Sequence, residues 1–178
     1  MNSVATDWRQ RAKPVRALLL DVDGVLTDGG LYFSDTGESL KRFNTLDGHG
    51  LKLLQRAGIE PIVITGRDSA ALRTRLKALS ITQAFFGVED KRAVAQTALN
   101  NLGLTWAQTA AMGDDWPDLP MLLASALAVA PPTAHPEVLS RVHHVTQAAA
   151  GHGAVREMCD ALLLASGHYP SLLAEVLK

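Results

Sequence analysis

Two carboxylates stand close together where an aliphatic run of the sequence ends. The run is Leu-Leu-Leu at positions 18–20, and Asp21 and Asp23 follow it in the stretch "DVDGVLTDGG". Acidic residues are common in turns and "DG" is a frequent turn signal, so a simple turn explains this pair when it is taken alone. An EF-hand calcium loop is excluded by its spacing, because Gly24 comes too early and Tyr32 stands at the position of the closing Glu.

Other residues that could do chemistry follow other aliphatic runs. "VITGR" places Thr65 and Gly66 after a second run, and "VEDK" places Lys91 where a helical pattern begins. "MGDDWPD" brings three further acids after another run, namely Asp114, Asp115 and Asp118. The order Asp, Thr, Lys, Asp, with each member at a strand end or a helix start, is far more specific than any one residue.

This set resembles the motifs of the haloacid dehalogenase superfamily of phosphohydrolases, and the resemblance implies the hydrolysis of a phosphate ester. An anionic nucleophile about 4 Å from an anionic substrate is repelled by roughly 4 kcal/mol at an effective dielectric constant near 20, so a cation must offset the repulsion. Mg²⁺ prefers hard oxygen ligands and usually binds through one or two carboxylates together with phosphate and water. Asp21 and Asp114 are the natural carboxylates for this ion, and Lys91 would add positive charge against the transferred group.

The pattern of apolar residues predicts the elements that position these side chains. Short β-like runs are expected at 16–20, 61–65, 84–86, 109–112, 127–129 and 143–145. Amphipathic helices are expected at 48–57, 69–79, 91–102, 118–124, 137–141 and 153–165, with Asp68 and Asp90 as N-caps. Alternation of this kind favours an α/β fold with a mostly parallel sheet, whose ligands bind beyond the carboxyl ends of the strands.

One segment interrupts the alternation, at residues 29–44 between the first strand and the first helix. Strand-like runs at 31–33 and 40–43 flank the turn residues "SDTG" and predict a β-hairpin insertion. A lone two-stranded hairpin is marginally stable in water. Because Tyr32, Phe33 and Phe43 make this one apolar, we expect it to pack on something, such as another subunit.

The motifs together resemble the haloacid dehalogenase superfamily of phosphohydrolases. The resemblance implies a Rossmann-like, doubly wound parallel sheet, and it implies Asp21 as a nucleophile that forms an aspartyl-phosphate. Asp23 would be the general acid and base, since residues i and i+2 of an extended stretch project to the same side. Thr65 and Lys91 complete the catalytic set, and Mg²⁺ would be held by Asp21, Asp114 and the backbone carbonyl of Asp23.

A narrower resemblance is to the phosphatases of 3-deoxy-D-manno-octulosonate 8-phosphate (KDO 8-phosphate), which act in lipopolysaccharide biosynthesis. It rests on "DVDGVLTDG", "FNTLDGHG", "ITGR", "GDDWPDLPM" and "GHGAVREMCD", with His49 and His152 as departures from the usual pattern. It implies a substrate site made of Asp23, Asn44, Thr45, Leu46, Asp47, Gly48, Gly66, Arg67, Arg75 and Lys91, with Asp115 and Lys52 as secondary candidates. The arginines would suit the carboxylate of a sugar acid.

The spacing of the motifs leaves no room for the cap domain that many members of this superfamily carry. Between Asp28 and Asp47 there is room only for a hairpin, and between Thr65 and Lys91 only for one helix and one strand. We therefore expect a capless single domain over residues 1–178. The resemblance implies a homotetramer built around the hairpins, with the C-terminal helix and tail at 151–178 near a neighbour's site.

The length, composition and net charge of the chain argue against several other classes of protein. The chain has 178 residues, 47% of them hydrophobic, and a formal net charge of −1, which gives no reason to expect nucleic acid or a membrane as a partner. Its single cysteine, Cys159, is expected to be buried and fits a reducing compartment. The opening residues lack the apolar core of a signal peptide, so a cytoplasmic protein is the expectation.

Three alternatives stay open on the sequence. A phosphatase of acylneuraminate 9-phosphates would carry the same motifs and act on a similar sugar acid. A phospho-aspartate receiver domain also uses acids, Thr and Lys on a doubly wound sheet, although a built-in acid and base at Asp23 favours turnover over storage. A catalytically silent assembly domain is disfavoured because no motif residue has been lost. A zinc site is disfavoured because the histidine spacings match no common ligand pattern.

Overall fold

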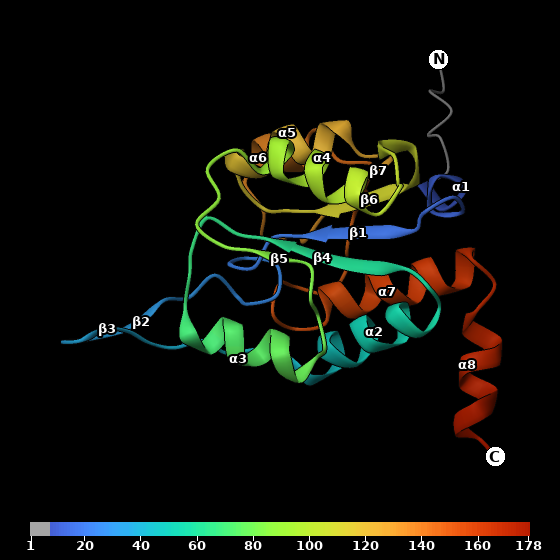
Figure 1. Cartoon of the computed structure of the whole chain (residues 1–178), viewed down its shortest axis with the longest axis horizontal. Helices are drawn as coiled ribbons and strands as arrows, with labels where there is room; N and C mark the ends of the chain where they lie inside the picture. The colour runs from blue at the N-terminus through green and yellow to red at the C-terminus, as the bar shows by residue number, and fades with distance from the viewer. Residues whose placement is uncertain (1–7) are drawn as a thin grey trace.

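The structure, a computed structural model, describes residues 8–178 and is built around one parallel sheet (Figure 1). Residues 1–7, part of the stretch in which no signal peptide was expected, lie outside the described residues. The six strands run in the order β5-β4-β1-β6-β7-β8. Their bounds are β1 Ala17–Leu20, β4 Glu60–Ile64, β5 Ala84–Phe85, β6 Thr109–Met112, β7 Leu127–Ala130 and β8 His144–Val145. The predicted α/β class and all six predicted strands are confirmed, to within one residue at either end.

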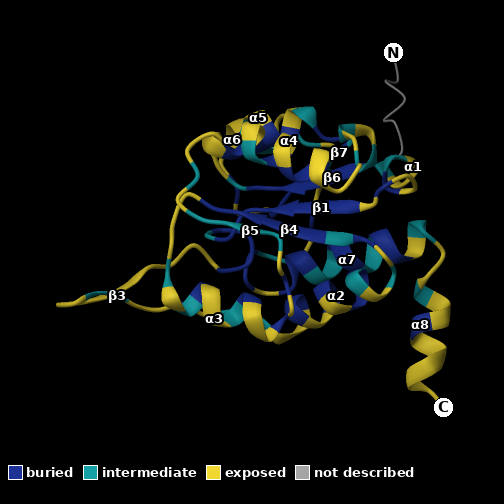
Figure 2. Ribbon diagram, viewed as in Figure 1, coloured by how far each residue is buried: buried dark blue, intermediate teal, exposed yellow. Residues whose placement is uncertain are grey.

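The central strand β1 is buried on both faces, which is why its sequence is continuously aliphatic. Leu18 and Leu20 point into the hydrophobic core on one face of the sheet, and Ala17 and Leu19 point into the core on the other. Figure 2 shows the strands of the sheet as the buried centre of the molecule. This burial fixes where β1 ends and therefore where the acids that follow it stand.

Helices cover both faces of the sheet (Figure 1). Helices α2, α3 and α7 share one core with the sheet, and α4, α5 and α6 share the other. The bounds are α2 Thr45–Arg56, α3 Ala70–Ala78, α4 Lys91–Asn101, α5 Leu119–Ala124, α6 Pro136–Leu139 and α7 Ala154–Ala165. The short 3₁₀ turns η1 (Trp106–Gln108) and η2 (Trp116–Asp118) lead into β6 and α5.

The six predicted helices are present, and two of their N-termini differ from the prediction in the capping residue or by more than one residue. Ser69, not Asp68, caps α3, because the Ser69 hydroxyl accepts the N–H of Leu72 while Asp68 forms an ion pair with Arg73. Helix α2 begins three residues earlier than expected, with Asn44 as its N-cap, so Asp47 lies inside its first turn. The predicted cap at Asp90 is confirmed by its hydrogen bond with the N–H of Ala93.

The hairpin is present, but its second strand was placed too late in the sequence. It consists of β2 (Tyr32–Ser34) and β3 (Gly37–Leu40), whereas the prediction put the second strand at 40–43. Tight pairing of Ser34 with Gly37 leaves only two residues in the turn, and Phe43 packs against the main core instead. The hairpin projects from the body of the molecule and is mostly exposed (Figure 2).

The capless architecture is confirmed, because only this hairpin is inserted between β1 and α2, and only α3 and β5 lie between β4 and α4. Two helices were not predicted: α1 (Trp8–Ala12), and α8 (Tyr169–Val176) at the C-terminal end, which lies beside the body in Figure 1. In residues 8–178 no helix combines the length and apolarity that a membrane crossing requires.

Candidate active site

The carboxyl ends of three neighbouring strands meet at one edge of the sheet. Leu20, the last residue of β1, pairs in register with Val63 of β4 on one side and with Met112 of β6 on the other. The residues that follow these strands therefore converge. They line an open cleft of about 380 Å³, which contains Asp21, Asp23, Thr65, Gly66, Arg67, Lys91, Asp114, Asp115 and Asp118.

Lys91 joins two of the acids in this cleft. Its Nζ lies 2.7 Å from Oδ1 of Asp21 and 2.6 Å from Oδ1 of Asp118, and all three side chains are almost fully buried. Burial by itself would lower the pKa of Lys91, but the charges of Asp21 and Asp118 outweigh it and raise that pKa. Lys91 is therefore cationic, and it stands where it can face a phosphoryl group attached to Asp21.

Burial also governs the two acids that were predicted to bind the metal. It raises the pKa of Asp21 to about 6, with the nearby charge of Asp118 adding to the effect and Lys91 opposing it. It raises the pKa of Asp114 to about 8, with the charges of Asp21, Asp118 and Asp115 adding to the effect. Ionisation of these acids is unfavourable in the metal-free site, and a bound cation would stabilise their charged forms.

The donor set fits a divalent cation. Oxygens of Asp21, Asp114 and Asp118 lie within 4.8 Å of one another. Oδ1 of Asp114 is buried and finds no hydrogen-bond partner among residues 8–178, so it is an oxygen that a metal ion could satisfy. Both oxygens of Asp118 are occupied, Oδ1 by Lys91 and Oδ2 by the N–H groups of Asp114 and Asp115. Asp118 therefore orients the site, and Asp21 and Asp114 stay the predicted metal ligands.

Two glycines allow the loops to come this close. Gly24 has a φ of +91°, and a Cβ there would lie 2.1 Å from Oδ2 of Asp114. A Cβ on Gly113 would lie 2.4 Å from Cβ of Asp118. Any side chain at these positions would push the carboxylates apart, which explains why "DG" and "GDD" occur at the two strand ends.

The second strand end supplies donors for phosphoryl oxygens. Thr65 is buried at the end of β4, where its Oγ1 accepts the N–H of Arg67 at 3.2 Å, and its hydroxyl hydrogen remains available to the cleft. Gly66 and Arg67 are exposed beside it. These residues lie where the sequence placed them.

Asp23 is held by the hairpin. Lys41, just after β3, forms an ion pair with Oδ1 of Asp23 and lies 3.3 Å from Oε1 of Glu38. Arg67 approaches Oδ2 of Asp23 at 3.8 Å and Oε2 of Glu38 at 3.5 Å. Asp23, the predicted general acid and base, therefore belongs to a group of four alternating charges with Lys41, Glu38 and Arg67.

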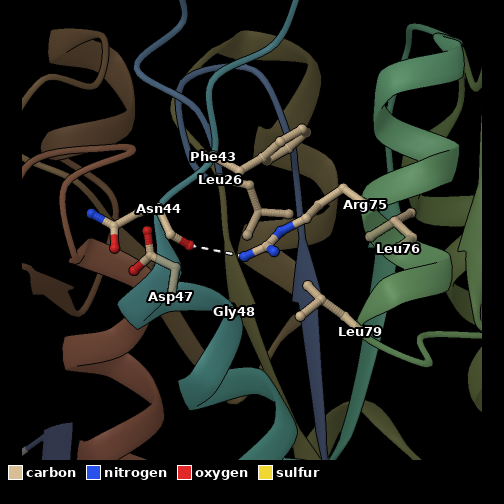
Figure 3. A pocket seen from close by; sticks show the side chains of 8 residues that line it. All are labelled: Leu26, Phe43, Asn44, Asp47, Gly48, Arg75, Leu76 and Leu79. Carbon is tan, nitrogen blue, oxygen red and sulfur yellow. Dashed lines mark hydrogen bonds between the residues drawn. The ribbon is translucent and has the colours of Figure 1, made fainter.

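The remaining predicted substrate residues lie elsewhere in the single chain. Asn44, Asp47, Gly48 and Arg75 line a small separate cavity between α2 and α3 (Figure 3). In Figure 3 the Arg75 guanidinium points at the carbonyl oxygen of Asn44, to which it donates at 3.0 Å, and it does not line the cleft that holds Asp21. Their role in binding substrate stays a prediction.

Three more candidates are exposed on or near α2. Thr45 and Leu46 lie in its first turn, and Lys52 lies on its outer side, outside the cleft of the same chain. Asp115 does line the cleft, at its exposed rim. Two histidines depart from the usual sequence pattern of the resembling family. His49 lines a mostly apolar cavity between α2, α7 and α8, and His152 forms a hydrogen bond with Arg42.

Sequence reasoning assigned no role to Asp118 or Lys41. Asp118 is part of the motif "GDDWPD", four residues after Asp114. At this short distance its side chain can accept a hydrogen bond from the N–H of Asp114, and this spacing is the signal that could have identified it. Lys41 carried no local signal, because its partner Asp23 lies 18 residues away in the chain.

Comparison with known proteins gives one consistent result. The family model of haloacid dehalogenase-like hydrolases matches residues 87–158. The 3-deoxy-D-manno-octulosonate 8-phosphate phosphatase of Yersinia pestis is 43% identical over 162 residues, which are 91% of this chain and 87% of the relative.

Solved structures agree with this match. The structure of the same kind of phosphatase from Moraxella catarrhalis, in complex with magnesium, phosphate and KDO, has a TM-score of 0.92 at 32% identity and covers 96% of this chain and 98% of that one. A cobalt-bound form from Haemophilus influenzae has a TM-score of 0.87 at 39% identity over 89% of this chain and 93% of that one. The chain therefore belongs to the haloacid dehalogenase-like hydrolases and, within them, to the family of the 3-deoxy-D-manno-octulosonate 8-phosphate phosphatases.

Proposed function

We propose that this protein is a Mg²⁺-dependent phosphatase that hydrolyses KDO 8-phosphate to KDO and inorganic phosphate, as a step of lipopolysaccharide biosynthesis. The observation that carries the proposal is the placing of Asp21 between a buried lysine and a second carboxylate. Lys91 holds one oxygen of Asp21, and Asp114 lies beside it with a buried oxygen that lacks a partner among residues 8–178. The similarity to phosphatases of this sugar acid supports the choice of substrate.

In the proposed reaction an oxygen of Asp21 attacks phosphorus, and the bond between phosphorus and the sugar oxygen breaks. Asp23 gives its proton to that departing oxygen, so the oxygen leaves as a neutral hydroxyl group of the sugar acid and not as an alkoxide. A water molecule then attacks the aspartyl-phosphate, loses its proton to Asp23 and releases phosphate, which restores both acids. Lys91, the Thr65 hydroxyl and the Gly66 N–H would stabilise the charge on the transferred phosphoryl oxygens.

Asp21, Asp114 and the Asp23 backbone carbonyl are the proposed ligands of Mg²⁺. When bound, the ion would neutralise the carboxylate and phosphate charges that otherwise repel one another. Asp118 serves this arrangement indirectly, because it fixes Lys91 and the loop that carries Asp114.

Self-association is part of the proposal, with a homotetramer as the expected form. The hairpin carries exposed apolar side chains at Leu31, Tyr32, Phe33 and Leu40 that one chain leaves uncovered. A neighbouring copy is also the route by which Arg75 and residues 44–48, which lie outside the cleft of their own chain, could reach a bound sugar. The proposal includes a cytoplasmic location, which suits the buried thiol of Cys159.

Phosphate release from a panel of esters tests this function. With Mg²⁺ the purified protein should turn over KDO 8-phosphate with a higher kcat/KM than acylneuraminate 9-phosphate or simple sugar phosphates. Asp21→Asn should lower kcat by at least about a thousandfold, because the nucleophile is lost while the volume is kept.

Asp68→Asn is the matched control, since Asp68 is an exposed acid outside the cleft, and it should retain activity. A higher kcat/KM for acylneuraminate 9-phosphate would mean that this ester, and not KDO 8-phosphate, is the substrate. Full activity in Asp21→Asn would refute the assigned nucleophile.

A further inference from the structure

We infer that Lys41 of the hairpin is a positioning residue that holds the Asp23 carboxyl group toward the leaving oxygen of the substrate and away from the metal ligands. This inference rests on the proposed function, and it gives the hairpin a task inside the cleft of its own chain. Neither the motifs nor the comparisons assign a role to Lys41.

Lys41 is buried, which is unusual for a lysine. The Lys41 side chain is only 1% exposed, although it follows a hairpin strand that is mostly in solvent. Burying an ammonium group is costly unless it is paired. Its partners are Asp23 and Glu38, and Asp23 is the nearer of the two. The sequence therefore places a desolvated charge directly on the proposed acid and base.

The two carboxyl oxygens of Asp23 have different partners. Oδ1 is held by Lys41, and Oδ2 faces Arg67 at 3.8 Å, whose side chain is 44% exposed. The firm contact is thus on one oxygen, and the other has a longer contact with Arg67, which lines the cleft together with Asp23. An acid held by one oxygen can present the other to the leaving group without turning.

The proposed role of Asp23 as a proton donor requires that its carboxyl group stay off the metal ion. Asp23 lies two residues from Asp21, and its own backbone carbonyl is a proposed metal ligand. A free carboxylate so close to a divalent cation would be attracted to it and lost as a proton donor. An ion pair to a fixed lysine opposes that rotation. Lys41 can do so because Glu38, three residues earlier, supports it from the other side.

The test uses leaving groups that differ in their need for a proton. Alkyl phosphates such as KDO 8-phosphate need general-acid help, whereas p-nitrophenyl phosphate has a leaving group that departs without it. For Lys41→Met we expect kcat/KM on KDO 8-phosphate to fall by about 100-fold, the lower range for a lost general acid, and on p-nitrophenyl phosphate by less than about tenfold. The difference between the two substrates is the readout, because a merely structural defect lowers both equally.

Two further variants separate positioning from folding. Lys41→Met leaves Oε1 of Glu38 without its cation, although Arg67 still contacts Oε2. The double variant Lys41→Met/Glu38→Leu removes both charges and should still show the difference between substrates. Lys77→Met, an exposed lysine on α3, is the matched control and should behave as the native protein.

Crystal structures of native and Lys41→Met protein with Mg²⁺ and phosphate complete the test. The Asp23 carboxyl group should change its rotamer in the variant. Equal losses on both substrates, or an unmoved Asp23, would overturn the inference. Should the native protein hydrolyse no phosphate ester, the proposed function fails, and the position of Asp23 in the two crystal structures still decides the role of Lys41.

Discussion

At the scale of single residues, the site is a balance between acids that repel one another and the cations that hold them together. Asp21, Asp114 and Asp118 offer oxygens within 4.8 Å of one another, and Lys91 donates hydrogen bonds to two of them, Asp21 and Asp118. Asp118 has no free oxygen, and Asp114 has one without a partner among the described residues. The structure therefore separates an acid that organises the loop from acids that can face a metal ion.

This balance predicts a pH dependence for the effect of Mg²⁺ on stability. The raised pKa values of Asp114, about 8, and Asp21, about 6, mean that the metal-free fold binds more protons than the unfolded chain between pH 3.8 and about pH 8. Stability from these groups is then fully present below pH 3.8 and is lost as pH rises through 6 to 8. Because Mg²⁺ needs ionised ligands, its affinity should rise by up to about tenfold per pH unit for each proton released.

Thermal unfolding with and without Mg²⁺ at pH 5.5 and pH 8 measures this effect. The increase in Tm on adding Mg²⁺ should be larger at pH 8. Asp114→Asn should abolish most of the Mg²⁺ effect while raising the Tm of the metal-free protein at pH 8, because it removes a charge that the cluster repels. An increase in Tm that is the same at both pH values would contradict these assignments.

At the scale of elements, Asp47 joins two helices. It lies in the first turn of α2, and its Oδ1 accepts the N–H of Arg156 at 2.8 Å in the first turn of α7. The N-cap of α7 is Gly153, which has no side chain to accept such a bond, so Asp47 caps α7 from a neighbouring helix. Burial raises its pKa above the ordinary value.

Loss of this cap should weaken the packing of α2 on α7. We expect Asp47→Ala to lower the free energy of unfolding by about 1–2 kcal/mol, since the partly buried N–H of Arg156 loses its acceptor. Asp47→Asn keeps an acceptor oxygen and should lose less. Urea denaturation, with the midpoint compared at constant slope, gives the difference. Asp160→Ala, which removes only a partly exposed pair with Arg156, is the control and should cost at most about 0.5 kcal/mol.

At the scale of the whole molecule, the hairpin leaves an apolar surface that a single chain does not cover. Phe33 is 62% exposed, and Leu31, Tyr32 and Leu40 are exposed around it. A two-stranded hairpin gains little stability by itself, so contacts with other copies are a physical reason for it to be ordered.

Assembly should therefore depend on the hairpin. We expect light scattering to give the mass of a tetramer for the native protein and smaller species for Phe33→Asp, because the charge would be buried in the interface. Leu123→Asp on α5 is matched in exposure, also at 62%, and should leave the assembly intact. Monomers in the native sample at micromolar concentration would rule out the proposed assembly. Dissociated Phe33→Asp that keeps its circular dichroism would show that the fold survives without the contact.

The sequence by itself determined the α/β sheet, the missing cap and the positions of Asp21, Thr65, Lys91 and Asp114. It could do so because each of these residues directly follows a buried strand or begins a helix, and the carboxyl ends of parallel strands must share one edge. Local patterns carry this information, so a single sequence is enough to read it.

Only the tertiary structure decided what Asp118, Asp47 and Lys41 do. Their partners lie on other elements, at Lys91, at the start of α7 and at Asp23. No periodicity connects such pairs, because their contact depends on how loops pack after the sheet has formed. The same holds for the second strand of the hairpin, whose register was set by a two-residue turn and not by its apolar residues. Spacing along the chain thus placed the groups that do the chemistry, and packing between elements chose the groups that hold them.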